Sequence, residues 1–439
     1  MTTWILAGAL VLVATIARTA EKPRLVVLTD IGGDPDDQQS MVRLMLYANE
    51  MDIEGLLATD RNEPERIIEI VDAYEQVRPR LLEHAPGYPK ADALRSITKV
   101  GLPNSRTVGS LGTDTEASDW IISVVDRDDP RPVDIAVWGG PGELAQALWR
   151  VREDRTANEV AEFISRIRVH AIDHQDETGA WILESFPGIW YILDNSQTGD
   201  KHVSCYRGMW KHGDRSLTSL AWLDEHVRHR HGPLGAAYPP RTAAPPENAL
   251  KEGDTPSWFY FLPHGFNDPT EPTWGGRGGR FQPEDGYIRD AQDTVGDETS
   301  RMATIWRWRQ AYQNEFQARL DWCVKPFGEA NHSPAAVLNG DRSRDVVRIS
   351  KRGGKRVKLS AARSTDPDGD ALAFKWFIYP EPGTYDGEVE LQGAGSETAR
   401  FVAPRVDEPA TIHVVLQTTD DGDPSLHSFR RAVVTVKPG

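Results

Sequence analysis

Aspartates crowd one short segment near the start of this chain of 439 residues, and they constrain its fold more than any other feature. An apolar, β-branched run begins at Arg24 and ends at Asp30, and glycines then mark a turn. Apolar residues recur at helical spacing from Met41 onward. This order predicts a strand, a loop and a helix, with acids at the carboxyl end of the strand, where open α/β sheets bind ligands. The acids of this segment are Asp30, Asp34, Asp36 and Asp37.

Carboxylates this close together repel one another unless a cation neutralises them. Hard oxygen ligands of this kind suit Ca²⁺ or Mg²⁺ better than zinc or copper. The alternative is a helix N-terminus capped by acids, but that role explains only one or two of the four. The segment therefore predicts a metal site.

The segment from Thr29 to Asp37 resembles the N-terminal D-x-D-P-G-x-D-D signature of the nucleoside hydrolase superfamily. The resemblance implies one Ca²⁺ ion bound by Asp30 and Asp37. It also implies that Asp30 is the general base for an attacking water molecule. Asp36 would then hold the hydroxyl groups of a sugar.

The chain departs from that signature in two ways. Leu28 stands where the first Asp is expected, and the loop is two residues longer. The extra length leaves open whether Asp34 replaces Asp36 at the sugar. The chain is most similar to a secreted bacterial subgroup labelled cellulose-binding, which implies an α/β domain with an open, mostly parallel sheet and an all-β, immunoglobulin-like sandwich after it.

The expected domain organisation has three parts. Residues 1–20 are predicted to be a signal peptide, because an uncharged apolar run from Trp4 to Ile16 precedes small residues. A retained N-terminal anchor is the alternative, although the run is too short for a stable membrane span. Residues 21–328 are predicted to form the α/β domain and residues 329–439 the sandwich. The expected location is secreted or periplasmic, and Cys205 and Cys323 either pair or stay free.

The remaining pattern alternates strands with helices as far as a linker near residue 325, which predicts a parallel sheet. Within it, residues 80–112 are expected to be irregular, residues 257–262 to form a strand and residues 298–322 a helix. A proline-rich loop over residues 238–255 is expected to cover the crevice. Beyond the linker, short strands are expected at residues 356–360, 371–379, 399–402, 411–418 and 428–436, the spacing of a sandwich. The run from Asp366 to Asp370 is read as a turn in preference to an ion-binding loop.

The same resemblance nominates residues at later strand ends. Asn62 follows the second strand, where the family places a sugar-binding Asn. A backbone carbonyl within residues 141–143, after a Gly-Pro turn, is expected to ligate calcium. Gln175 and Asp176 are expected to line the pocket and Trp181 to form a wall. The alternative is that Thr178 caps a helix and the tryptophan packs beneath it.

A late motif completes the implied site. Asp268 is expected to be the last acidic calcium ligand, and Asn267 stands where the family has a His. His264 is therefore the candidate general acid. Trp274, in a glycine-rich rim, is expected to stack on a sugar.

The composition limits the partners. The net charge is −16, so phosphate backbones and anionic membranes are poor partners and no nucleic-acid binding is expected. Fourteen tryptophans favour carbohydrate, although core packing explains many of them equally well. The sequence leaves the oligomeric state open.

The expected function is calcium-dependent hydrolysis of an N- or O-glycosidic bond in a carbohydrate or nucleoside-like substrate. A metal-activated water would attack the anomeric carbon. The alternative is a non-catalytic protein that uses calcium and aromatic rings to bind a cellulose-type glycan. In a third interpretation, the sandwich is only a spacer or a dimerisation module.

Overall fold

The structure is a computed structural model, and it describes residues 21–104, 106–195, 200–284 and 286–439. The signal peptide expected at residues 1–20 lies outside the described residues. Within those ranges, no helix has the length and apolar character needed to cross a membrane.

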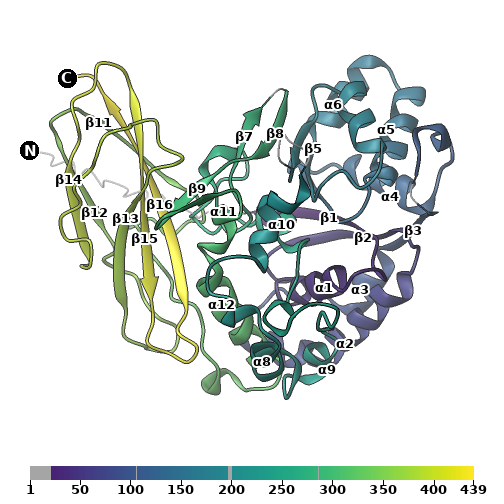
Figure 1. Ribbon diagram of the computed structural model, residues 1–439, viewed down its shortest axis with the longest axis horizontal. Helices are drawn as coiled ribbons and strands as arrows, with labels where there is room; N and C mark the ends of the chain where they lie inside the picture. The colour runs from purple at the N-terminus through teal and green to yellow at the C-terminus, as the bar shows by residue number, and fades with distance from the viewer. Residues whose placement is uncertain (1–20, 105, 196–199, 285) are drawn as a thin grey trace, which may run out of the picture.

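An eight-stranded sheet forms the centre of the first domain, with strand order β3-β2-β1-β4-β5-β6-β8-β7 (Figure 1). Neighbouring strands are parallel except β7 and β8, which are antiparallel. The open, mostly parallel sheet expected from the sequence is thus confirmed. The strands are β1 (Arg24–Thr29), β2 (Asp52–Asp60), β3 (Thr98–Pro103), β4 (Val133–Val137), β5 (Ile167–Ala171), β6 (Trp190–Leu193), β7 (Phe281–Glu284) and β8 (Tyr287–Asp290).

Helices cover both faces of this sheet, which is why its strands are apolar on both sides. In β1, Leu25 and Val27 belong to one buried cluster, whereas Val26 and Leu28 belong to the other. One face packs on α1 (Asp36–Leu46), α2 (Pro64–His84), α3 (Ala91–Ser96), α8 (Leu220–Leu223), α9 (Gly232–Ala236), α10 (Thr255–Phe259), α11 (Ala303–Trp306) and α12 (Arg309–Asp321). The opposite face packs on α4 (Glu116–Val125), α5 (Gly142–Asp154), α6 (Ala157–Ser165) and α7 (Thr178–Ser185).

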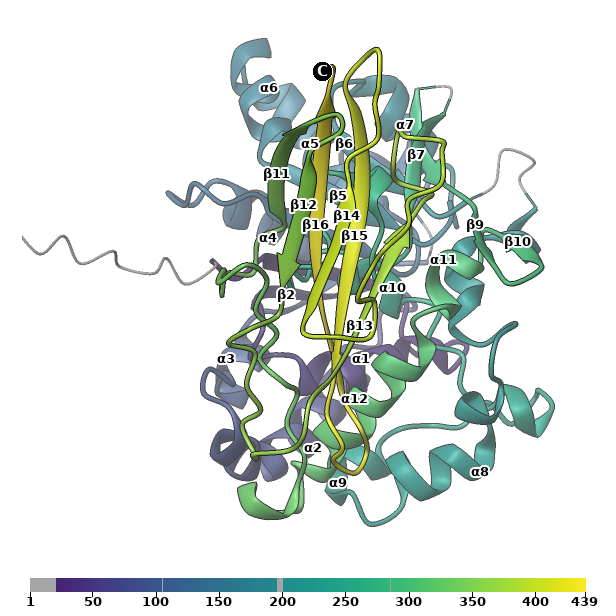
Figure 2. The same ribbon diagram turned by 90° about the vertical axis from the view of Figure 1, so that its left-hand side faces the viewer.

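The second domain is a β-sandwich that lies beside the α/β domain in Figure 1 and in front of it in Figure 2. A four-stranded sheet, in the order β11-β16-β15-β13, faces the pair β12-β14 across a separate buried core. All expected strands are present, and β11 is an additional one. The strands are β11 (Val347–Arg352), β12 (Arg356–Ser360), β13 (Ala373–Tyr379), β14 (Thr398–Val402), β15 (Ala410–Thr419) and β16 (His427–Lys437).

Three local expectations were wrong. Residues 257–262 are not a strand, because α10 continues through residue 259 and a turn follows it. The aromatic residues of this segment are buried on every side, so their hydrophobic pattern cannot distinguish helix from strand. The stretch 80–112 contains α3 and the edge strand β3. The helix expected over residues 298–322 is broken into β10 (Glu298–Ser300), α11 and α12, and β10 pairs with β9 (Asp293–Val295).

The two domains share a polar and aromatic interface. Arg431 of β16 is fully buried and donates to the carbonyl oxygens of Trp274 at 2.5 Å and Gly275 at 3.0 Å. The Tyr379 hydroxyl of β13 donates to Asp293 Oδ2 at 2.6 Å. These side chains of the sandwich therefore satisfy buried polar groups of the α/β domain.

The two cysteines are both free and buried. Cys323 lies after α12, and its thiol donates to the Arg319 carbonyl oxygen at 3.6 Å. Cys205 begins the short helix η3 (Cys205–Met209) beside the central sheet.

A buried ion pair fixes the loop between α9 and α10 to α1. Arg43 and Glu252 are both 0 % exposed, and they meet through two hydrogen bonds of 2.5 and 3.0 Å. We expect Glu252→Gln to lower the free energy of unfolding by about 3–5 kcal/mol, because it leaves the guanidinium buried without its countercharge. Urea denaturation followed by tryptophan fluorescence measures this loss.

The matched control is Glu83→Gln, which removes an ion pair with Arg80 whose side chains are 45 % and 40 % exposed. It should change the free energy of unfolding by less than about 1 kcal/mol. Equal losses in the two variants would contradict the importance of the buried pair.

Candidate metal and sugar site

The first acids are held at the carboxyl edge of the sheet by the turn from β1 into α1. The β1 strand is buried along its whole length, and the chain leaves it at Asp30. Gly32 then adopts a positive φ of 112°, a conformation that favours glycine. Asp36 and Asp37 occupy the first turn of α1, where the helix dipole favours negative charge.

A third carboxylate joins these two from a distant part of the chain. Oxygen atoms of Asp36, Asp37 and Asp254 lie within 4.8 Å of one another, and all three residues are buried. Asp37 accepts a hydrogen bond from Thr29 Oγ1 at 2.5 Å. Within the described part of the chain, no donor reaches the buried Oδ2 atom of Asp254.

The electrostatics of this cluster call for a cation. Burial, followed by the charges of Asp30 and Asp36, raises the pKa of Asp37 well above its usual value. Burial and the charges of Asp36 and Asp37 do the same to the pKa of Asp254. Lys251 forms ion pairs with Asp34 at 2.5 Å and with Asp36 at 2.8 Å, which leaves the other carboxylates unneutralised.

The donor set fits a hard divalent ion. Two ligands of one Ca²⁺ ion each lie about 2.3–2.6 Å from it, so they are at most about 5 Å apart. The separations within the cluster meet this limit. The oxygen-only chemistry and the unpartnered atom of Asp254 fit the same ion.

The acidic cluster borders a cavity of about 510 Å³. Six acids and four bases surround this cavity, so its formal charge is negative. Neutral or cationic ligands therefore suit it better than anions. Its charged lining residues are Asp30, Asp34, Asp36, Asp37, Asp173, Asp254, Arg61, Lys201, Arg207 and Lys251. A second hollow of about 560 Å³ shares Asp30, Arg61 and Gln175 with it.

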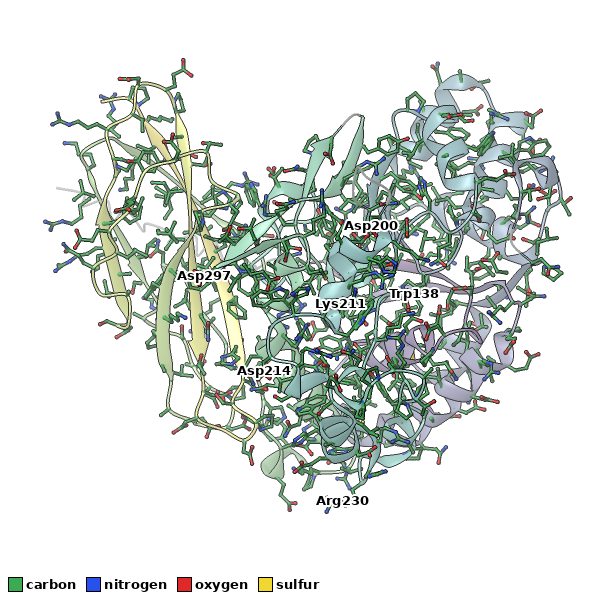
Figure 3. The ribbon with its side chains drawn as sticks, viewed as in Figure 1. Trp138, Asp200, Lys211, Asp214, Arg230 and Asp297 are labelled. Carbon is green, nitrogen blue, oxygen red and sulfur yellow. The ribbon has the colours of Figure 1, made fainter. Side chains whose placement is uncertain are left out.

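The end of β4 forms the floor beside Asp30. Trp138, labelled in Figure 3, donates from Nε1 to Ser257 Oγ of α10 at 3.0 Å. A Cβ atom on the next residue, Gly139, would lie 2.7 Å from Asp30 Oδ1, so only glycine lets the carboxylate approach this closely. Of the backbone carbonyls expected to ligate calcium, that of Pro141 already accepts a hydrogen bond from the Ala145 N–H. The Trp138 side chain lines the cavity.

The Glu143 side chain, from the same turn, serves the scaffold. It is buried, forms an ion pair with Arg106 at 2.9 Å and accepts a hydrogen bond from the Leu102 backbone. Its oxygens are therefore engaged away from the acidic cluster.

The loop after β5 brings part of the expected set to the cavity. Gln175 lines it and donates to the Trp138 carbonyl oxygen at 2.5 Å. Asp176 uses Oδ1 to accept from Thr178 at the start of α7, and its buried Oδ2 lies against Gly140. Trp181 packs on Phe186 at 5.7 Å and beneath Arg152, the scaffold role that was the alternative for this tryptophan.

The turn after β2 carries Asn62. This residue takes a positive φ of 59°, and its buried Oδ1 atom has no partner within the described residues. Its neighbours Arg61 and Glu63 line the second hollow.

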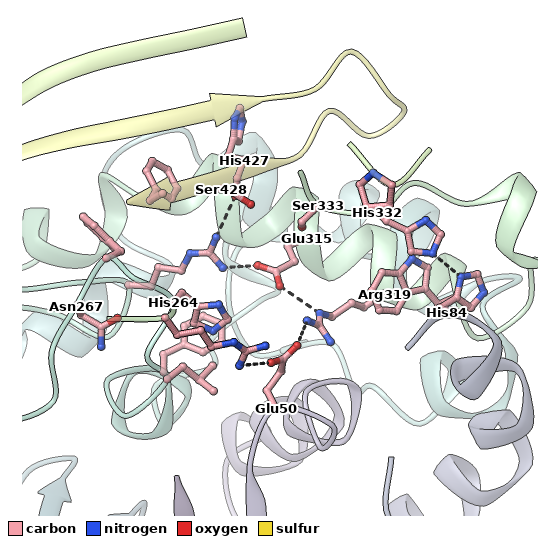
Figure 4. A pocket seen from close by; sticks show the side chains of 18 of the residues that line it. Glu50, His84, His264, Asn267, Glu315, Arg319, His332, Ser333, His427 and Ser428 are labelled. Carbon is pink, nitrogen blue, oxygen red and sulfur yellow. Dashed lines mark hydrogen bonds and ion pairs between the residues drawn. The ribbon is translucent and has the colours of Figure 1, made fainter. Parts of the chain in front are cut away.

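The late motif lies elsewhere, at the boundary with the sandwich. His264 and Asn267 line a separate pocket of about 320 Å³ with Glu50 and Glu315 (Figure 4). Burial lowers the pKa of His264 to about 4. Asn267 donates to the Tyr260 carbonyl oxygen at 2.7 Å.

Two more residues of that motif contact the sandwich directly. Asp268 forms an ion pair with Arg348 at 3.1 Å. Trp274 is buried against His413 at 5.2 Å and Arg348 at 4.5 Å. The structure brings Asp254, and not Asp268, into the acidic cluster.

A sequence signal marks the position of Asp254. The loop expected over residues 238–255 ends in Gly253, Asp254 and Thr255, and Pro256 follows, so an acid stands just before a helix with Pro in its first turn. That loop also supplies Lys251. Tyr206 and Arg207, which form another wall of the cavity, follow no strand directly and carry no motif.

The fold and the acidic cavity together define a nucleoside-hydrolase-like α/β protein with an appended β-sandwich. A family model described as "Cellulose-binding Sde182, nucleoside hydrolase-like domain" matches residues 24–281, and one described as "Cellulose-binding protein Sde0182, C-terminal domain" matches residues 356–436. The chain belongs to this family, which confirms the expected resemblance.

A solved structure supports the assignment. A nucleoside hydrolase-related hypothetical protein from Saccharophagus degradans, described as associated with carbohydrate metabolism, is 34 % identical with a TM-score of 0.81. The match covers 95 % of this chain and 100 % of that chain. The PKD domain from KIAA 1837 protein is 19 % identical over 21 % of this chain and 83 % of that chain. Its TM-score of 0.17 is too low to support an assignment. A search of curated proteins finds no match.

Calcium should stabilise this protein through the acidic cluster. At a calcium concentration about 100 times the dissociation constant, we expect a gain of about 2.7 kcal/mol, seen as a rise in Tm. Asp254→Asn should abolish the calcium-dependent rise because it removes a buried ligand. Differential scanning fluorimetry with and without CaCl₂ measures it.

Asp268→Asn is the matched control. Its partner is Arg348, so the variant should keep the full response to calcium. Loss of the response in the control but not in Asp254→Asn would reverse the assignment, and an unchanged wild-type Tm would refute the site.

Proposed function

We propose that this protein is a calcium-dependent glycosyl hydrolase that acts outside the cytoplasm on a carbohydrate. The observation that carries the proposal is the buried cluster of Asp36, Asp37 and Asp254. Too few basic side chains neutralise this cluster, and it borders the cavity that Asp30 also lines. The extracytoplasmic location rests on the expected signal peptide and on a family named for binding cellulose.

Asp37 and Asp254 are the residues that would hold the ion, with Asp30 beside them. When bound, calcium supplies a water molecule of lowered pKa and a contact for sugar hydroxyl groups. Asp36 is the better candidate for those hydroxyls than Asp34, because the side chain of Asp34 is 44 % exposed and that of Asp36 only 13 %.

Asp30 is the general base in this proposal. Burial and then the charge of Asp36 raise its pKa in the metal-free protein. Its carboxylate lines the cavity, where it can accept a proton from water. Its close approach to Gly139 fixes its position. Asp30 takes a proton from water as the water attacks the anomeric carbon. The bond from that carbon to the leaving oxygen or nitrogen breaks, the leaving group takes a proton from solvent, and this single displacement inverts the configuration.

The acidic lining supports the positive charge that develops on the sugar. An oxocarbenium-like transition state is stabilised by carboxylates placed around it beforehand. The excess of acids over bases in the cavity also favours a neutral sugar over an anionic one. An oligosaccharide of the cellulose type, joined by O-glycosidic bonds, is the substrate class we propose first, and nucleosides second.

A non-catalytic sugar-binding role is the second candidate, and one observation favours it. A protonated imidazole that could donate to a leaving group is missing from the described lining of the cavity. Burial lowers the pKa of His174, which does line the cavity, to about 4, so this imidazole is neutral near pH 7. His264 faces the interdomain pocket instead.

Asp30→Asn separates the two candidates. In the hydrolase, it should lower kcat by about 10²- to 10⁴-fold, because the base is lost while the cavity keeps its shape. Affinity for the oligosaccharide should stay within a few-fold. The assay follows product release from cello-oligosaccharides and nucleosides with calcium present, and calorimetry measures binding.

The control is Asp268→Asn, which should leave turnover unchanged. Binding of cello-oligosaccharides by the wild type without any product, at every calcium concentration, would establish the binding role and refute the hydrolase.

A further inference from the structure

A second buried cluster of ligand-type side chains lies beside the central sheet, apart from the acidic cavity. It consists of His170 in β5, Asp194 just after β6, Cys205 at the start of η3 and Asp290 at the end of β8. Three of the residues are 0 % exposed and Asp290 is 2 % exposed. Imidazole, thiol and carboxylate groups thus meet where water does not reach them.

The distances in this cluster suit one small ion. Asp194 Oδ1 lies 3.0 Å from His170 Nε2 and 3.4 Å from Cys205 Sγ. Ligand atoms of Asp194, Cys205 and Asp290 all lie within 4.8 Å of one another. Tetrahedral zinc with bonds of about 2.0–2.3 Å places its ligand atoms about 3.3–3.8 Å apart, which the Asp194–Cys205 distance meets. His170 lies outside the group of three and contacts it through Asp194, so its ring has to move toward the ion to become the fourth ligand.

The carboxylates are poorly compensated without an ion. Asp194 Oδ2 and Asp290 Oδ1 are buried, and no donor among the described residues reaches either atom. The other oxygen of Asp290, Oδ2, accepts one hydrogen bond, from the Cys205 backbone N–H at 2.8 Å. No Lys or Arg of the described ranges forms an ion pair with either carboxylate; Asp194 pairs only with His170. Buried charges in proteins are paired or coordinate metals.

We propose that His170, Asp194, Cys205 and Asp290 bind a structural zinc ion. The mixture of imidazole, thiolate and carboxylate suits zinc, whereas the oxygen-only cluster near Asp37 suits calcium. Four protein ligands leave no open position, so this ion holds structure and does not activate water. On binding, the Cys205 thiol and any protonated carboxyl group release their protons to solvent, and the ligand electron pairs bind the metal.

The site would fix one wall of the cavity. Tyr206 and Arg207, which line the cavity, directly follow Cys205 in η3. Asn195 follows Asp194 and donates from Nδ2 to Asp173 Oδ1 at 2.7 Å, and Asp173 lines the cavity as well. Two of the four ligands are therefore one residue away from groups that shape the cavity, and this holds whether or not the cavity is catalytic.

Elemental analysis of the full-length protein, purified without chelators from zinc-supplemented cells, tests the proposal. We expect one zinc per chain in the wild type and loss of that zinc in Cys205→Ser and Asp290→Asn. Cys323→Ser removes the other buried thiol and should keep the metal. Asp254→Asn should also keep it, which separates this site from the calcium cluster.

Measurements on the wild type keep the test valid if the ligand variants fail to fold. Zinc X-ray absorption should show one sulfur ligand at about 2.3 Å and nitrogen or oxygen ligands at about 2.0–2.2 Å. Cobalt substitution should give the near-ultraviolet absorption of a thiolate bound to Co²⁺. Removal of zinc by a chelator should lower Tm.

Three results would overturn the proposal. The first is wild-type protein that holds no zinc after supplementation, which would mean that the two carboxyl groups share protons in a metal-free hydrogen-bonded network. The second is zinc without a sulfur ligand. The third is the same zinc content in folded Cys205→Ser as in the wild type.

Discussion

Repulsion between buried carboxylates is the constraint on which the functional edge of this protein depends. Parallel strands all end at one side of the sheet, and each brings polar residues to that side. In this chain the polar residues are largely acids: Asp30 follows β1, Asp173 follows β5 and Asp194 follows β6. Asp194 is buried, and Asp30 and Asp173 are partly buried. Acids at such density require countercharge, and the described lysines and arginines provide only part of it. The acidic cluster of Asp36, Asp37 and Asp254 is thus suited to hold a metal ion.

The local part of this arrangement could be predicted from the sequence. The β1 strand, its turn and the first acids of α1 lie within some fifteen residues, so periodicity and turn residues are sufficient to place them. The strands of the sandwich alternate over one buried core, and their positions were predicted to within two residues. The prediction of a strand at the aromatic run after Ser257 was wrong because this run is buried on every side and shows no hydrophobic period.

Contacts between distant segments could not be predicted. Asp254 reaches Asp37 because the α9–α10 loop is fixed by the Arg43–Glu252 pair, a contact over 209 positions of sequence. His264 was assigned to the site through a family motif, but the sandwich covers that segment and buries it in the interdomain pocket. No local sequence pattern indicates that another domain will cover a segment. The cluster of Asp194, Cys205 and Asp290 could not be predicted for the same reason, because its members come from separate elements with no common spacing.

The position of β16 has a consequence for how the chain matures. This strand is central in its sheet, between β11 and β15, and its Arg431 satisfies carbonyl groups of the α/β domain. It is also the last of the described strands to leave the ribosome. The α/β domain therefore emerges with unsatisfied carbonyls and an uncovered aromatic surface around Phe266 and Trp308, which Phe429 of β16 later contacts. The interface therefore assembles only once β16 is available, and until then the uncovered aromatic surface is open to association with other chains.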